Sequence, residues 1–106
     1  MNNICMVGKV VSAPLLKETA NGNKFASLEL EVERNFPNSE GQYESDVFMI
    51  TLWKGLAESC VASCPEQAIV SVKGRVSAKS YETKEGNKQH YCEIVAEKIN
   101  CLTFAQ

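Results

Sequence analysis

Aromatic and basic residues stand close together near the ends of several predicted strands. Trp53 is followed directly by Lys54, Tyr81 comes two residues after Lys79, and Phe36 ends the run that contains Arg34. On an exposed sheet, bases stack on such rings for about 1–3 kcal/mol each while the cations bind phosphates. The pattern predicts a surface for single-stranded nucleic acid, but it fits rings that cap the core beside solvated lysines about equally well. The remaining candidates for phosphate contacts are Arg34, Lys73, Arg75, Lys84 and Lys88.

A metal site is the second chemistry that the sequence could support. Cys60 and Cys64 are four residues apart, so on a helix they share a face and could both reach one ion. His90 and Cys92 alternate along a predicted strand, so their side chains point apart. The cysteines therefore fit small buried hydrophobic residues better than ligands, and we expect no metal and no cofactor.

Three glutamates follow one another on a single strand face. Glu29, Glu31 and Glu33 alternate with apolar residues, the period-2 pattern of a strand with one buried and one wet face. With one histidine, no Gly-rich phosphate loop and no carboxylate pair in an apolar setting, the chain lacks the parts of an active site. We expect a protein that is not an enzyme, with glutamates that pair with basic residues of a neighbouring strand or subunit or border the ligand path.

The composition agrees with one globular domain over residues 1–106, because 44% of the residues are hydrophobic. Eleven basic and thirteen acidic side chains give a net charge of −2, so nucleic-acid binding would depend on local placement of charge. No apolar run is long enough to span a bilayer and no signal peptide follows the first residue. With five cysteines, an odd number, the sequence predicts a cytoplasmic protein with reduced thiols and no membrane partner.

The order of the predicted elements defines the expected fold. The first strand is apolar on both faces, which suggests that another subunit covers one of them. A Pro14-containing connection with the Asn21-Gly22 turn follows, and the last strand changes its alternation near Glu97, as at a bulge. The expected strands are 2–11, 25–34, 47–53, 68–81 and 90–104, with a short helix over 54–64. We expect Val70, Val72, Val76 and Ala78 to point inward from the fourth strand. This is the pattern of an all-β, five-stranded OB-fold barrel with one short helix between strands 3 and 4.

The ordered set of segments resembles the bacterial single-stranded DNA-binding protein (SSB) family. The segments are "NNICMVGKVVSAPLLKETANGNKFASLELEV", "ITLWKGLAE", "VSVKGRVSAKSYETKEGNK" and "EIVAEKINCL", and they cover nearly all of the chain. The resemblance implies an OB-fold that binds single-stranded DNA without catalysis, as a homotetramer associated with the bacterial nucleoid. It places Trp53, Tyr81 and Phe36 at base-stacking positions and Lys17 and Lys79 at basic ones.

Departures from the family pattern leave two functions open. Val47 stands where a fourth stacking aromatic is common, Met49 where a basic or polar residue is common, and Glu29 and Glu31 replace small or neutral residues. The family's flexible linker and acidic tip, which recruit partner proteins, would lie beyond Gln106, where the printed sequence ends. The first hypothesis is binding of single-stranded DNA with little sequence preference, protecting it during replication, recombination or repair together with proteins of those pathways. The alternative is an OB-fold protein-interaction module of the dimeric, primosomal type with weak single-stranded nucleic-acid binding.

Overall fold

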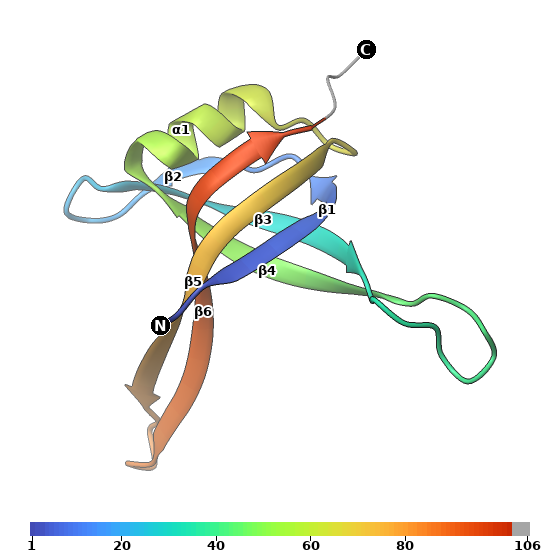
Figure 1. The fold of residues 1–106 in the computed structure, drawn as a ribbon. Helices are drawn as coiled ribbons and strands as arrows, with labels where there is room; N and C mark the ends of the chain where they lie inside the picture. Colours follow the sequence, from blue (N-terminus) through green and yellow to red (C-terminus); the bar gives the residue numbers. More distant parts are fainter. Residues whose placement is uncertain (103–106) are drawn as a thin grey trace.

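The computed structural model describes residues 1–102 and forms a twisted barrel capped by one helix (Figure 1). The elements are β1 (Ile4–Ser12), β2 (Leu16–Glu18), β3 (Lys24–Glu33), β4 (Ser45–Trp53), α1 (Lys54–Ser63), β5 (Ile69–Glu82) and β6 (Lys88–Cys101). The predicted continuation of the last strand to residue 104 falls partly outside the described residues. No helix within residues 1–102 is long and apolar enough to cross a membrane.

Five strands close the barrel in the order β1-β5-β6-β4-β3, and β3 pairs back onto β1. All of these pairs are antiparallel except β4 with β6, which run parallel. The helix lies between the third and fourth barrel strands, so the predicted OB-fold is confirmed. The segment predicted to be only a connection contains a sixth, three-residue strand, β2, which pairs with the start of β3.

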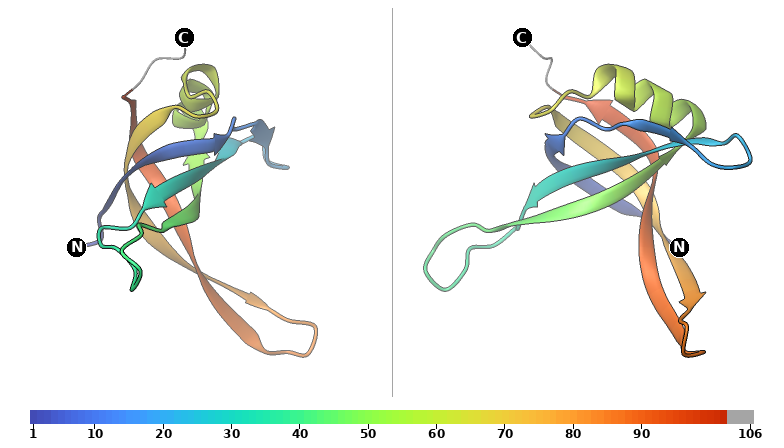
Figure 2. Two further views of the ribbon diagram at one scale, coloured as in Figure 1. Left: turned by 90° about the vertical axis from the view of Figure 1, so that its right-hand side faces the viewer. Right: turned by 180° about the vertical axis from the view of Figure 1, so that it is seen from behind.

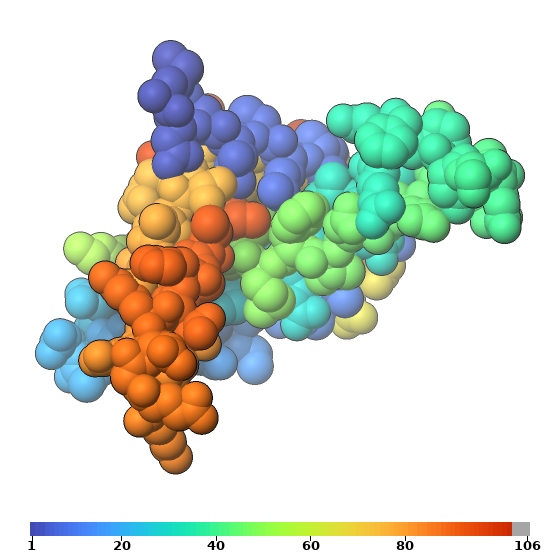
Figure 3. Space-filling model, turned by 90° about the horizontal axis from the view of Figure 1, so that it is seen from below, coloured from blue at the N-terminus to red at the C-terminus, as the bar shows by residue number. Residues whose placement is uncertain are grey.

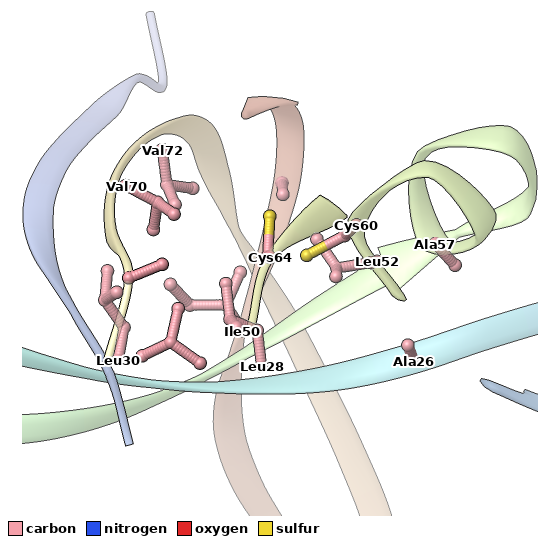
Figure 4. Close-up of a cluster of buried hydrophobic side chains, with 13 residues drawn as sticks. Ala26, Leu28, Leu30, Ile50, Leu52, Ala57, Cys60, Cys64, Val70 and Val72 are labelled. Atoms are coloured by element: carbon pink, nitrogen blue, oxygen red, sulfur yellow. The ribbon is translucent and has the colours of Figure 1, made fainter. Parts of the chain in front are cut away.

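The core is built from the inward faces that the alternation predicted. Leu28 and Leu30 of β3 and Ile50 and Leu52 of β4 are fully buried, as expected for side chains of period 2 (Figure 4). Helix α1 closes one end of the barrel with Ala57 and Cys60. Val10, Val70 and Val72 complete the centre.

Beyond the barrel, β5 and β6 continue as a two-stranded arm, residues 76–93, that projects away from the helix end (Figure 2). Within the barrel part of β6 the register changes: Lys73 pairs with Lys98, but Gly74 pairs with Ala96, so Glu97 is the extra residue of a bulge. This confirms the predicted bulge. The prediction that Ala78 points into the core is wrong, because it lies on the arm and is exposed.

The first strand has apolar side chains on both faces, as predicted. Val10 is buried and Met6 packs against the core. On the opposite face Val7 is 57% exposed and Cys5 is also exposed. One apolar side of β1 therefore faces away from the core of this chain.

Candidate nucleic-acid interface

A row of three side chains crosses β2, β3 and β4 on the outside of the barrel. Lys17 pairs with Phe25, and Phe25 pairs with Trp53. Because directly paired residues project from the same face of a sheet, one ammonium group and two rings lie side by side. The ring centroids of Phe25 and Trp53 are 5.4 Å apart, with the ring planes inclined at 38°. We call these three residues the aromatic row.

Lys54, directly after Trp53, has an unusual backbone conformation. Its φ of 53° lies in the left-handed region, although it carries a side chain. A residue other than glycine pays about 1–3 kcal/mol for such a conformation, and residues of this kind cluster at functional sites. Lys54, whose side chain is exposed, thus keeps this conformation directly after Trp53 at some cost in stability.

Arg75 lies on the same outer face, one row further along. Thr51 of β4 pairs with Val95 of β6, and Val95 pairs with Arg75 of β5. Thr51 and Trp53 are two residues apart on one strand, so their side chains share a face. Lys73 is two residues before Arg75 on β5, so it shares this outer face, and it pairs with Cys5 of β1 and Lys98 of β6.

The arm presents two tyrosines on one face. The ring centroids of Tyr81 and Tyr91 are 5.9 Å apart, with the planes inclined at 56°, and both side chains are about half exposed. Lys79 pairs directly with Tyr91, and its Nζ lies 3.8 Å from Oε2 of Glu93. The arm therefore carries two rings and a cation together, and its exposed tip adds Lys84 and Lys88.

Phe36 lies apart from the aromatic row, at the other end of β3. Phe36 follows the end of β3 at Glu33, whereas Phe25 stands near the start of the strand. Along an extended strand, Phe25 and Glu33 are about 25 Å apart. The Phe36 ring is 68% exposed and borders an open hollow of about 590 Å³ that is also lined by Phe48. Seen from below, β4 is exposed between the arm and the loop of residues 35–44, which carries Phe36 (Figure 3).

Arg34, a predicted phosphate contact, is already bound within the chain. Its guanidinium donates hydrogen bonds to both carboxylate oxygens of Asp46 and to one oxygen of Glu44. The hydrogen bonds with Asp46 raise the pKa of Arg34 and lower the pKa of Asp46. Because two carboxylates compensate this charge, we do not retain Arg34 as a phosphate contact.

The glutamates lie in the middle of the outer face. Glu29 pairs with Met49, and Glu31 pairs with Val47 on one side and with Lys9 of β1 on the other. Lys9 therefore stands opposite Glu31 on a neighbouring strand, and pairing of the glutamates with basic side chains stays a prediction. The exposed Val47 and Met49 and the half-buried Glu29 and Glu31 interrupt the face between the aromatic row and the Phe36 end.

The cysteines do not form a metal centre with His90. Cys60 and Cys64 are buried at the helix end of the barrel. Burial is the main cause that raises the pKa of the Cys60 thiol, and a hydrogen bond with Cys64 is the second. His90 lies on the exposed arm and pairs with Ser80. Within residues 1–102, no three His, Cys, Asp or Glu side chains are grouped so that they could hold an ion.

Phe25 and Tyr91 were absent from the predicted site. Phe25 has the same parity as Glu29 and Glu31, so the alternation of β3 could have placed it on the outer face. Tyr91 could have been found by folding the hairpin about Glu85, which brings it opposite Lys79.

The fold and this surface define the class of protein. It is an OB-fold protein whose outer barrel face and arm carry exposed aromatic rings with lysine and arginine beside them. The model of the single-strand binding protein family matches residues 1–102. The chain belongs to this family, which confirms the resemblance seen in the sequence. The family is described by binding and not by catalysis, in agreement with the prediction that the chain is not an enzyme.

Individual relatives agree with this assignment. The chain is 34% identical to single-stranded DNA-binding protein B of Bacillus subtilis, over 95% of this chain and 89% of that protein. It is 31% identical to a single-stranded DNA-binding protein of Enterococcus faecalis, over 96% of this chain and 54% of that protein. A crystal structure of a deletion mutant of the single-stranded DNA-binding protein from Thermus aquaticus superposes with a TM-score of 0.80 at 22% identity, over 97% of this chain and 51% of that one. The chain thus spans about half the length of the last two proteins.

Proposed function

We propose that residues 1–106 form one domain that binds single-stranded DNA along the outer barrel face and the arm, with little sequence preference. The aromatic row carries the proposal, because it places an ammonium group beside two rings on an exposed sheet. Every base has a π-face, so stacking on these rings tolerates any sequence. The names of the Bacillus subtilis and Enterococcus faecalis relatives support the same ligand.

In this proposal the rings and cations have separate tasks. Trp53, Tyr81 and Phe36 stack bases, as the sequence predicted, and Phe25 and Tyr91 extend two of these stacking sites. The phosphates between stacked bases meet Lys17, Lys54, Arg75 and Lys79. Lys84 and Lys88 at the arm tip and Lys73 near β1 act at the periphery.

We further propose that the protein works as a homo-oligomer, a tetramer or alternatively a dimer. The exposed apolar face of β1, with Val7 and Cys5, supports this because a second copy could cover it. The corresponding role is protection of single-stranded DNA during replication, recombination or repair, in the cytoplasm at the nucleoid and with proteins of those pathways. The relatives do not favour the alternative of a primosomal interaction module.

The test uses Trp53, which is the single tryptophan of the chain. Oligo-dT should quench its fluorescence at low salt and micromolar protein, because a base stacks on the indole. A duplex of the same length should quench it much less, since its bases are already stacked with one another. Absence of quenching by oligo-dT under these conditions would contradict the proposal.

A further inference from the structure

A network of polar contacts joins the two sides of the loop between β3 and β4. Arg34 Nε donates to Asp46 Oδ2 at 3.0 Å, and Nη2 donates to Asp46 Oδ1 at 2.9 Å. Its third donor, Nη1, reaches Glu44 Oε2 at 2.9 Å. The backbone N–H of Arg34 donates to the carbonyl oxygen of Glu44 at 2.8 Å. Because the two-pronged contact fixes the plane of the guanidinium, the network sets the geometry of the loop base.

Glu44 extends this network to the tip of the loop. Its second oxygen, Oε1, accepts a hydrogen bond from Asn38 Nδ2 at 3.1 Å. Asn38 Oδ1 in turn accepts the backbone N–H groups of Glu40 at 2.9 Å and Gln42 at 3.0 Å. The carboxylate of Glu44 therefore connects the Arg34 contacts at the base with the turn at the tip.

Phe36 stands between these two fixed points. It is two residues after Arg34 and two before Asn38, and its ring is 68% exposed. A polar ten-residue loop without such ties would sample many conformations, and a ligand would have to order it on binding. A loop ordered in advance avoids that loss when the ligand binds.

We propose that Arg34 is a positioning residue, which holds the loop of residues 35–44 so that Phe36 is ready to stack on a base. This inference rests on the proposed function, since it requires single-stranded DNA as the ligand. It replaces the role of phosphate contact that the sequence suggested for Arg34. The guanidinium acts through Asp46 and Glu44 and does not touch the DNA.

A tryptophan introduced at position 36 gives a local readout. The parent protein for the experiment carries Phe36→Trp and Trp53→Phe, so its single indole reports stacking at position 36 while position 53 keeps a ring. Arg34→Gln removes the charge and the network. Arg34→Lys keeps the positive charge but cannot donate the two parallel hydrogen bonds to Asp46. Lys24→Gln is the matched control, because it also removes one positive charge and one exposed ion pair, Lys24 Nζ to Glu58 Oε1 at 3.3 Å, at the opposite end of β3.

Oligo-dT should quench the parent protein, and Arg34→Gln should lose most of this quenching with about 2- to 10-fold weaker binding, the cost of ordering one or two side chains. Arg34→Lys should be intermediate, and Lys24→Gln should keep the parent's quenching at position 36. Without DNA, Arg34→Gln should speed hydrogen exchange at the amides of Glu40 and Gln42 relative to Lys24→Gln.

Two failures are distinguishable in this design. A parent protein that binds no oligo-dT contradicts the proposed function before any Arg34 variant is compared. A parent that is quenched, with equal quenching in Arg34→Gln, overturns the positioning role alone. Unchanged hydrogen exchange in Arg34→Gln also overturns it, because the loop would then be ordered without the network.

Discussion

Phe25 of β3 and Trp53 of β4 lie directly opposite each other on the outside of the barrel, with ring centroids 5.4 Å apart. Trp53 remains 38% exposed, so a base can reach its ring while Phe25 supports it from the side. In the proposed function, this pair is a preformed stacking site on the barrel face.

Replacing Trp53 with alanine should weaken oligo-dT binding by about 1–3 kcal/mol, the usual contribution of one stacked base. Phe25→Ala should also weaken binding, and the double variant should lose less than the sum, because each ring supports the other. Fluorescence anisotropy of a labelled oligonucleotide measures all three variants without the tryptophan signal. Equal affinity of Trp53→Ala and wild type would show that DNA does not use this face.

Tyr91 should contribute to binding on the arm. Tyr91→Ala removes one ring of the tyrosine pair and should lower affinity by about 1 kcal/mol or more. His90→Ala is the control. His90 is the neighbour of Tyr91 on β6, so its side chain points to the opposite face of the arm. The same anisotropy titration compares the two variants, and equal losses of affinity would contradict the assignment of Tyr91.

The glutamates on β3 should oppose binding. Replacing Glu29 with Thr and Glu31 with Ala removes two negative charges beside Val47 and Met49 and should tighten binding about 3- to 10-fold at low salt. The gain should shrink as salt screens the charges. Glu66→Gln, on the connection between α1 and β5, is the control for the general effect of removing a negative charge away from β3. An unchanged affinity of the double variant would place the DNA path away from β3.

Lys54 should lower the free energy of unfolding and raise the affinity for DNA. Lys54→Gly relieves a left-handed backbone at φ 53° and should raise the free energy of unfolding by up to about 1 kcal/mol. Lys54→Ala keeps the strain, so it should not stabilise the protein, but both variants should lose DNA affinity because both lack the ammonium group. Thermal unfolding and the DNA titration together test this, and full affinity in both variants would remove Lys54 from the interface.

The barrel could be predicted because the alternation in β3 and β4 specifies buried faces directly. The slip of parity at Glu97 likewise marked the bulge, since an extra residue shifts every later side chain. Ala78 was misplaced because the alternation does not say where β5 leaves the barrel. The three residues of β2 were missed because so short a strand has no measurable period.

The site was less predictable than the fold. Parity could have revealed Phe25, but the partners of Arg34 are ten and twelve residues away across a loop and follow no period. The sequence alone does not show whether a basic side chain is already paired with a carboxylate of the same chain. The separation of Phe36 from the aromatic row also depends on the pairing of β3 with β4, which only the structure gives.

The salt dependence of oligo-dT binding tests the central proposal most directly. Four cations of the barrel face and the arm, Lys17, Lys54, Arg75 and Lys79, predict that log K falls with log salt with a slope of about −3. Trp53 fluorescence, titrated at several salt concentrations, measures that slope together with stacking. Quenching whose affinity falls steeply with salt is the expected result. An affinity that does not change with salt, or no quenching at low salt, would contradict binding of single-stranded DNA on this surface.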